Sequence, residues 1–343
     1  MTQISRTNVV ALVLLTGLPA ASLVNGDSTT SATSPLRAPP IATDLALPEP
    51  TGPHPVGLTN LRIAQPIGPE LTVTLWYPAI DDAGPDAMYV TPERSREILA
   101  SRLGEHATPE ILSTTRTHAT ADAEPLDENL PLVVVLAGLN QHGTSMGGLA
   151  LDLGSRGYAV ATVDWSSATP QVANASTVLD DLLASTSIRI DSEQVAVVGH
   201  SAGGEAAALV VRTDPRFRAG ISFDSTFPPD ITADVATPFM MLDSPIYAYD
   251  NTSTNWLHLT GWRRWYIVNG STHSSFTDYQ LLFEQLGLPG YEGATISGAR
   301  ASSIVRSYVA AFVDLHLRGV PQPLLEPPQF PDVIFRDPPQ AAP

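Results

Sequence analysis

The sequence predicts an α/β fold, in which a mainly parallel, doubly wound sheet is flanked by helices. Apolar runs of strand length alternate with helical segments along most of the 343 residues. This alternation is typical of strands joined by right-handed helical crossovers, which make neighbouring strands parallel. Polar residues suited to catalysis directly follow several of these strands. Because the carboxyl ends of parallel strands share one edge of a sheet, we expect a functional site at that edge.

Strands are expected where apolar residues alternate with polar ones or run continuously. Residues 71–77 alternate until Pro78, which is the pattern of a half-buried strand. Residues 132–136 are all apolar, which favours a strand buried on both faces. Further strands are expected at residues 158–164, 195–198, 219–223, 238–242 and 265–268.

Helices are expected between these strands. Two Thr-Pro-Glu triplets, at residues 91–93 and 108–110, each predict the start of a short helix. Thr caps the first turn, Pro is tolerated in it, and the acidic side chain favours the helix dipole. Other helices are expected at residues 149–154, 174–187, 205–211 and 300–317.

The amino-acid composition narrows the classes of protein and partner. Apolar residues make up 43% of the chain, enough to fill the core of one large domain. The 35 acidic residues outnumber the 18 basic ones, and the net charge of -17 repels the phosphates of nucleic acids. The chain has no cysteine, which excludes disulfides, thiolate metal sites and cysteine nucleophiles. The spacing of histidines and carboxylates does not match that of zinc hydrolases, so we expect neither metal nor cofactor.

Four segments of different composition are expected along the chain. Residues 1–26 have the pattern of a signal peptide, with Arg6 before a short apolar run and small residues after it. The apolar run is too short to span a bilayer, so we do not expect it to anchor the protein in a membrane. Because a signal peptide directs export, we expect a protein that is secreted or periplasmic. Residues 27–55 are rich in Pro, Ser and Thr and predict a linker. Residues 56–320 predict the catalytic domain, and residues 321–343 a Pro-rich mobile tail.

A Gly-His-Ser-Ala-Gly pentapeptide at residues 199–203 joins an apolar strand to a segment rich in helix formers. Strand, sharp turn and helix form the context of a nucleophile elbow, in which the central serine takes a strained backbone conformation. The flanking glycines remove side chains that would collide with the neighbouring strand and helix. We therefore interpret Ser201 as an exposed nucleophile at a helix N-terminus, which favours developing negative charge.

A serine nucleophile needs a base, and the base needs an orienting acid. After Ser201, His273 is the histidine that lies in a loop directly following a strand, so we expect it to be the base. Asp224 and Asp243 each end a predicted strand and are both candidates for the acid. The residue pattern slightly favours Asp243, because the strand before the histidine loop often carries the acid. The order nucleophile, acid, histidine is that of α/β-hydrolases.

Stabilisation of the oxyanion is expected from main-chain N–H groups on two sides of the serine. One donor would be Ala202, the residue after the nucleophile, and the other Leu139, in the loop after the strand at residues 132–136.

A further indication of fold and activity comes from several short segments between residues 50 and 320. These segments are residues 52–57, 75–79, 131–135, 138–139, 199–204, 220–224 and 272–278. Together they resemble the motifs of the platelet-activating-factor acetylhydrolase-like branch of the α/β-hydrolases, and Thr-His-Ser-Ser-Phe-Thr-Asp at 272–278 is the most specific of them. The resemblance implies that Asp224, and not Asp243, is the triad acid. It also implies a calcium-independent serine esterase that prefers short or oxidised acyl chains on phospholipids or small esters.

Three departures from the family pattern bear on the substrate. Residues 137–140 read Ala-Gly-Leu-Asn where the family has His-Gly-Leu-Gly, and Ala202 stands where it usually has Phe. Ser225 and Thr226 follow Asp224, where an aromatic residue is common. These changes hollow out the pocket wall and leave the triad intact. A wider pocket would suit bulky aromatic esters or polyesters.

The expected function is that of an exported serine carboxylic-ester hydrolase active in lipid degradation through an acyl-enzyme. Its partner is a small-molecule or lipid ester, with transient contact with a membrane or micelle surface, and not nucleic acid. One alternative is a secreted polyester hydrolase of cutinase or lipase type with the same triad, and another is acyl transfer to an alcohol. A third, from a different class, is a catalytically silent binding protein, although such proteins usually lose the serine or the histidine.

Overall fold

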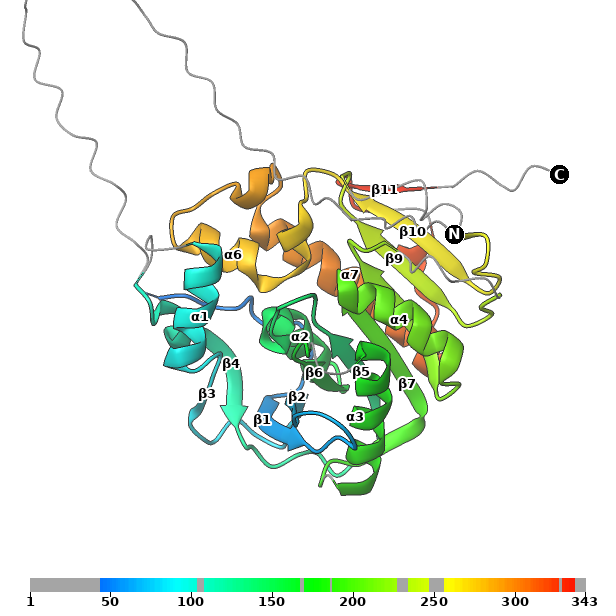
Figure 1. Cartoon of the computed structure of the whole chain (residues 1–343), viewed down its shortest axis with the longest axis horizontal. Helices are drawn as coiled ribbons and strands as arrows, with labels where there is room; N and C mark the ends of the chain where they lie inside the picture. Colours follow the sequence, from blue (N-terminus) through cyan, green and yellow to red (C-terminus); the bar gives the residue numbers. More distant parts are fainter. Residues whose placement is uncertain are drawn as a thin grey trace, which may run out of the picture. The chain divides into compact units, whose positions relative to one another are not determined.

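One large mixed sheet organises the part of the chain that the structure describes. The computed structural model describes residues 44–103, 108–166, 170–185, 187–226, 234–246, 256–326 and 329–336. Within these residues, an eleven-stranded sheet has the order β11-β10-β9-β8-β7-β5-β6-β2-β1-β4-β3 (Figure 1). The predicted signal peptide and the first part of the predicted linker lie outside the described residues.

The centre of the sheet is parallel, as the sequence predicts. The six strands from β6 to β10 in the sheet order pair in parallel, and antiparallel pairs occur between β1 and β2, β2 and β6, β3 and β4, and β10 and β11. The strands are β1 Val56–Ile63, β2 Leu71–Pro78, β3 Asp86–Met88, β4 Arg116–Ala121, β5 Leu130–Leu136, β6 Ala159–Val163, β7 Ile190–His200, β8 Phe217–Phe223, β9 Phe239–Asp243, β10 Arg263–Val268 and β11 Val333–Phe335.

Helices cover both faces of the sheet (Figure 1). α2, α6 and α7 pack with one face, and α3 and α4 with the other. The α-helices are α1 Pro92–Arg102, α2 Gly147–Ser155, α3 Gln171–Ser185, α4 Ala202–Thr213, α6 Asp278–Gln285 and α7 Gly298–Arg318. Short 3-10 helices are η1 Ile111–Thr114, η2 Gly143–Met146, η3 His273–Phe276, η4 Tyr291–Gly293 and η5 Pro323–Leu325. Among the described residues, no helix is both long and apolar enough to cross a bilayer.

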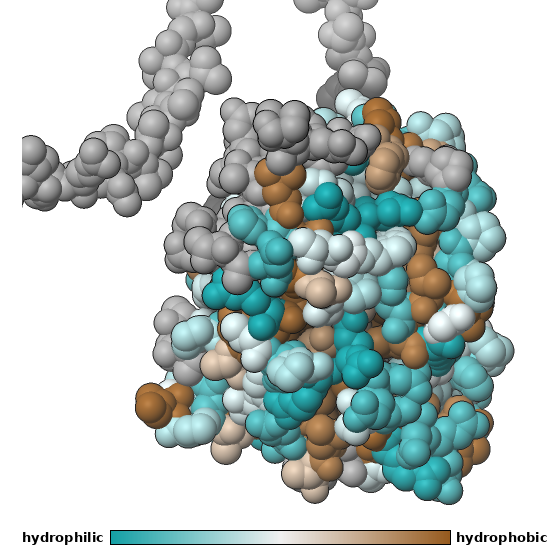
Figure 2. All heavy atoms as spheres, turned by 90° about the vertical axis from the view of Figure 1, so that its right-hand side faces the viewer, coloured by the Kyte–Doolittle hydropathy of each residue, from teal (hydrophilic) through white to brown (hydrophobic). Residues whose placement is uncertain are grey.

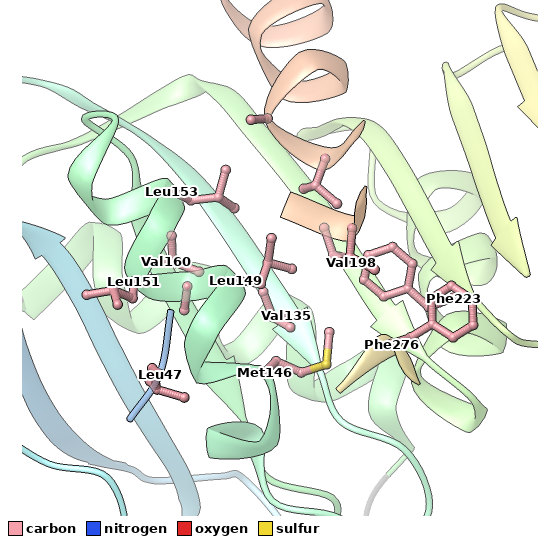
Figure 3. Close-up of a cluster of buried hydrophobic side chains, with 14 of the residues drawn as sticks. Leu47, Val135, Met146, Leu149, Leu151, Leu153, Val160, Val198, Phe223 and Phe276 are labelled. Atoms are coloured by element: carbon pink, nitrogen blue, oxygen red, sulfur yellow. The ribbon is translucent and has the colours of Figure 1, made fainter. Parts of the chain in front are cut away.

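The two faces of the sheet belong to two separate apolar clusters. Val133 and Val135 of β5 pack with residues of α2 and α7, whereas Leu132 and Val134 pack with residues of α3 and α4. Successive side chains of a strand point to opposite faces, which explains why this run has no polar residue. Figure 3 shows part of the first cluster, where Val135 and Val198 lie beside Leu149 of α2 and Phe223 of β8.

The predicted linker boundary is wrong for residues 44–55. Leu45 and Leu47 are 1% and 2% exposed, and Leu47 lies beside α2 in the apolar cluster of Figure 3. The backbone N–H of Leu47 donates to Arg116 of β4, and the Arg116 N–H donates to Leu45. Composition pointed to a linker because prolines surround these leucines. Their alternate spacing places both in the core.

The predicted mobile tail is also wrong in part. Within residues 321–343, β11 pairs antiparallel with β10, and Leu325 is 1% exposed. Strand β11 adds its hydrogen bonds to the edge of the sheet, so this part of the chain completes the fold. On the side of the molecule that carries this edge, hydrophilic and apolar side chains are interspersed (Figure 2).

The two Thr-Pro-Glu triplets have different outcomes. Thr91 caps α1, and its hydroxyl accepts a hydrogen bond from the backbone N–H of Arg94. The triplet at residues 108–110 is followed only by the four-residue 3-10 helix η1, in which Glu110 makes no side-chain cap. Without a side-chain cap or an amphipathic continuation, the segment forms only this short turn.

Candidate active site

Ser201 lies at the sharp turn between the end of β7 and the start of α4. Its φ is 56° and its ψ is -124°, a conformation that a serine adopts only under constraint. The Ser201 N–H donates to the carbonyl of Phe223 at 2.9 Å, and the Ser225 hydroxyl donates to the Ser201 carbonyl at 2.7 Å. Hydrogen bonds from β8 and the segment after it therefore hold the strained residue in place.

The two glycines around Ser201 are required by close backbone contacts. A Cβ on Gly199 would lie 1.9 Å from the carbonyl oxygen of Gly203. A Cβ on Gly203 would lie 2.2 Å from the carbonyl oxygen of Leu136, at the end of β5. Side chains at either position would separate the strand, the turn and the helix, so the pentapeptide is a steric requirement of this turn.

Strand order brings the predicted site residues to one edge of the sheet. β7 lies between β5 and β8, with Gly199 opposite Leu136 and His200 opposite Phe223. The loop after β5 reaches Ser201, because a Cβ on Gly138 would lie 3.0 Å from the Cβ of Ser201.

His273 is paired with Asp224. The Nδ1 atom of His273 lies 2.7 Å from Oδ2 of Asp224, whose side chain is fully buried. The other carboxylate oxygen, Oδ1, accepts a hydrogen bond of 2.7 Å from the backbone N–H of Ser244. Both oxygens of Asp224 therefore have a donor, and the carboxylate fixes the orientation of the imidazole.

Asp243, the alternative acid, faces a different partner. Its Oδ2 atom accepts a hydrogen bond of 2.8 Å from the indole Nε1 of Trp265 on β10. Burial, and after it the negative charge of Asp224, raise the pKa of Asp243 well above its usual range. Asp243 is thus a buried carboxyl group beside the pair of Asp224 and His273.

His200 and Gln141 connect the serine, the histidine loop and the loop after β5, a role that sequence reasoning missed. The His200 Nε2 lies 2.9 Å from the carbonyl oxygen of His273, and its Nδ1 lies 3.1 Å from the amide oxygen Oε1 of Gln141. The rings of His200 and His273 are 4.4 Å apart. The Gln141 side chain also packs 3.1 Å from the Cβ position of Gly138. The available signal was that His200 directly precedes the nucleophile.

The protonation of His200 follows from its surroundings. Burial, together with the nearby His273, lowers the pKa of His200 well below its usual range, so the ring is neutral. A neutral imidazole has one N–H, and Nε2 uses it to donate to the His273 carbonyl. Nδ1 faces Oε1 of Gln141, which is also an acceptor, so the single N–H of the neutral ring serves one of these two oxygens.

The two expected oxyanion donors lie on the elements that flank Ser201. Ala202 is the first residue of α4, where backbone N–H groups have no partner within the helix. Leu139 follows Gly138, in a turn closed by a hydrogen bond of 2.9 Å from the Gln141 N–H to the Gly138 carbonyl. This arrangement suits stabilisation of negative charge beside Ser201.

The histidine loop is held from outside by polar contacts. Ser274 donates through its N–H and its hydroxyl to the carboxylate of Glu292, at 3.0 and 2.7 Å. Thr272 and Ser275 form a capping box around η3. These bonds fix the backbone on either side of His273. Within the described residues, no group of three or more histidines and carboxylates is arranged to hold a metal ion.

Comparison with known proteins shows that this chain is similar to ester-cleaving enzymes. The family model described as "Platelet-activating factor acetylhydrolase, isoform II" matches residues 174–293, a range that contains Ser201, Asp224 and His273. The platelet-activating factor acetylhydrolase of Cavia porcellus is 22% identical over 344 residues, covering 79% of this chain and 78% of that protein. A probable 1-alkyl-2-acetylglycerophosphocholine esterase of Arthroderma benhamiae is 25% identical over 168 residues, covering 42% and 43%.

A solved structure is similar over nearly the whole described domain. The ferulic acid esterase from Streptomyces cinnamoneus is 32% identical, with a TM-score of 0.72. The alignment covers 85% of this chain and 99% of that one. The likeness thus covers a larger share of this chain than the family model does.

Proposed function

The chain belongs to the platelet-activating-factor acetylhydrolase-like esterases of the α/β-hydrolase superfamily, and we propose that it is an exported serine esterase with the triad Ser201, His273 and Asp224. The α/β-hydrolase fold and the carboxylic ester hydrolase activity predicted from the sequence are confirmed by these likenesses. We propose the serine mechanism and the roles of its residues, and we also propose the substrate and export.

The observation that carries the mechanism is the 2.7 Å contact between His273 and Asp224, at the sheet edge where the strained Ser201 lies. Asp224 accepts the Nδ1 proton of His273, and the Nε2 atom of His273 takes the hydroxyl proton of Ser201. The serine oxygen attacks the ester carbonyl as that proton leaves. The N–H groups of Leu139 and Ala202 stabilise the oxyanion.

Collapse of the tetrahedral intermediate expels the alcohol, which takes the proton from His273. Water then attacks the acyl-enzyme, with His273 again accepting a proton and returning it to the Ser201 oxygen. Each half of the cycle returns His273 to its neutral form. The buried Asp224 stabilises the imidazolium that forms in between.

Replacement of the nucleophile tests the mechanism. Ser201→Ala is expected to lower kcat for p-nitrophenyl acetate by at least about 10⁴-fold, because no side chain remains to form the acyl-enzyme. Fluorophosphonate should label the wild type at Ser201 and leave the variant unlabelled. Unchanged turnover in a folded Ser201→Ala variant would contradict the proposal. An unlabelled, inactive wild type would favour the silent binding protein.

The proposed substrates are short-chain acyl esters, either at the sn-2 position of phospholipids or in small molecules. The likeness to the platelet-activating factor acetylhydrolase of Cavia porcellus supports phospholipid esters. The departures from the family pattern in the pocket wall favour small-molecule esters. The ferulic acid esterase favours a specific alternative, an ester with an aromatic acyl group, because it is the more similar in sequence. Measuring kcat/KM for an sn-2 acetyl phospholipid, p-nitrophenyl acetate, methyl ferulate and a polyester film decides among them.

Export is proposed from the composition of residues 1–26, which lie outside the described residues. Expression of the full chain in a bacterial host, followed by N-terminal sequencing of protein from the periplasm and medium, tests it. A mature chain that begins near residue 27 is expected. Full-length protein retained in the cytoplasm would contradict export and leave the esterase proposal untouched.

A further inference from the structure

A single peptide group beside the proposed base is held at both of its ends. This group joins His273 to Ser274. Its carbonyl oxygen lies 2.9 Å from Nε2 of the buried His200, and its N–H donates to Oε2 of Glu292 at 3.0 Å. The other carboxylate oxygen of Glu292 accepts a hydrogen bond of 2.7 Å from the Ser274 hydroxyl. The backbone next to the base is therefore fixed by a buried imidazole on one side and by the carboxylate of an exposed residue on the other.

Glu292 makes these contacts from a strained backbone conformation. Its φ is 57° and its ψ is 16°, in the left-handed region that favours glycine. Six of the described residues other than glycine have a positive φ. Three of them, Asn140, Ser201 and Asp224, belong to the proposed triad or to the loop of the expected oxyanion donor. A glycine at position 292 would avoid the strain but would supply no acceptor, so the glutamate points to a use for its carboxylate.

The segment around Glu292 is anchored on both sides. Before it, the ring of Tyr291 packs edge-on against an aromatic ring of α6, with the centroids 4.8 Å apart. After it, the N–H groups of Thr295 and Ile296 donate to the carbonyl of Gly270 at 2.8 and 3.1 Å. Because Gly270 precedes the histidine loop, this one segment holds the chain on both sides of that loop. Such contacts determine the backbone strongly enough to keep one residue in a strained conformation.

We propose that Glu292 is a positioning residue for the base His273. The inference rests on the proposed function, because it concerns the base of that mechanism. The carboxylate fixes the peptide group after His273 and, through it, the distance from the imidazole to the Ser201 hydroxyl. Proton transfer is sensitive to this distance, and a displacement of about 1 Å can lower a rate by a factor of about 10². A carboxylate also accepts a stronger hydrogen bond from an N–H than a neutral group does.

The experiment removes the carboxylate without straining the backbone. Glu292→Gly suits the left-handed conformation, and it is expected to lower kcat for p-nitrophenyl acetate about 10- to 50-fold with KM changed by less than about threefold. Both acylation and deacylation use His273, so the loss is expected whichever step limits kcat. The rate constant for labelling of Ser201 by fluorophosphonate, which also needs the base, should fall by a similar factor.

The conservative variant Glu292→Gln should rescue most of the activity. Its amide oxygen can accept from the Ser274 N–H, and its NH₂ group can donate to the Ser274 hydroxyl. Its kcat should therefore stay within about threefold of the wild type. Ser274→Ala removes one of the two contacts and should lower kcat less than Glu292→Gly does. Added to Glu292→Gly it should have little further effect, because both changes act on the same contact.

A matched control strains the loop between α6 and Glu292 and keeps the carboxylate. Gly287 has a φ of 83°, and a Cβ added there would have no atom within 4 Å. Gly287→Ala is expected to lower the melting temperature, because alanine rarely adopts this conformation, and to leave kcat within about twofold of the wild type. Glu292→Gly should melt close to the wild type, since relief of strain offsets the lost contacts. A loss of kcat without a loss of stability is thus the mark of positioning.

Wild-type kcat in Glu292→Gly would overturn the inference, and so would an equal loss of kcat in Glu292→Gln. An equal loss in Gly287→Ala would also overturn it, because loosening of the loop would then be sufficient. A change confined to KM would exclude an effect on the base. A wild type that neither hydrolyses p-nitrophenyl acetate nor reacts with fluorophosphonate would instead contradict the proposed function, so the two failures are distinguishable.

Discussion

The ends of β8 and β9 look alike in sequence and differ in the folded protein. Each strand is a buried apolar run followed or ended by an aspartate whose side chain is fully buried. Asp224 lies against His273 and receives a second hydrogen bond from the Ser244 N–H. Asp243 receives the indole N–H of Trp265.

The difference lies in the partners of these two buried carboxyl groups. Asp224 contacts a histidine, and each of its two carboxylate oxygens lies 2.7 Å from a nitrogen. Burial, and after it the negative charge of Asp224, raise the pKa of Asp243, and the hydrogen bond from the Trp265 indole offsets only part of this rise. Two identical side chains on neighbouring strands can therefore have separate roles.

The largest effect expected from this comparison concerns turnover. Asp224→Asn should lower kcat for p-nitrophenyl acetate by about 10⁴-fold, because an amide no longer holds the catalytic tautomer of His273. Asp243→Asn should stay within about tenfold of the wild type, since Asn resembles the neutral acid and can still accept from Trp265. Steady-state kinetics of both variants side by side is the measurement. If only Asp243→Asn abolishes turnover, the assignment of the acid is wrong.

A third buried aspartate extends the comparison to stability. Asp278, at the start of α6, accepts hydrogen bonds from the Gly148 N–H and the Tyr89 hydroxyl, yet burial raises its pKa to about 7. Well below pH 4 the group is protonated in both the folded and the unfolded state. As the pH rises from about 4 to about 7, the unfolded chain ionises first, so the folded state loses up to about 4 kcal/mol of stability.

Asp278→Asn removes this titration. The free energy of unfolding of the variant, minus that of the wild type, should rise by up to about 4 kcal/mol between pH 4 and pH 7. Urea unfolding of both proteins at pH 4, 5.5 and 7 measures the difference. A difference that stays constant over this range would show that the Asp278 carboxyl does not titrate there.

A smaller effect is expected from the pair of His200 and Gln141 that links the two active-site loops. His200→Ala should lower kcat about 10²-fold with little change in KM, because it releases the backbone of His273 and shifts the base relative to Ser201. His200→Asn, which keeps a donor for the His273 carbonyl, should recover part of the loss. A change confined to KM or to the melting temperature would argue against positioning.

A second effect of pH on stability concerns Asp243. Its raised pKa means that the folded state disfavours ionisation, so its contribution to stability is present below the ordinary aspartate pKa and is lost as the pH rises above it. Asp243→Asn should therefore gain stability relative to the wild type as the pH rises from 4 to 8. Melting temperatures across this range test the direction. A relative loss with rising pH would mean that Asp243 is ionised in the folded state.

Much of the fold was predictable because local patterns carried it. The all-apolar run in β5 predicted burial on both faces, and the structure divides its side chains between two apolar clusters. The predicted helix after residues 108–110 failed because the segment has no side-chain cap and no amphipathic continuation, and it forms only a 3-10 turn. The predicted linker boundary was wrong at Leu45 and Leu47, which are buried. The prediction used the composition of the whole segment, which is rich in proline, and did not consider the positions of these two leucines.

The sequence by itself determined the turn at Ser201. Gly199 and Gly203 are dictated by contacts within a few residues and with the adjacent strand, so a pentapeptide suffices to predict it. Only the tertiary structure decided which aspartate meets His273, because that contact joins residues 49 positions apart in the chain. It depends on the order of β7, β8, β9 and β10 and on which side chains face the sheet edge. The link from His200 to Gln141 and the contact of Glu292 with Ser274 arise in the same way, from loops that meet only in the folded protein.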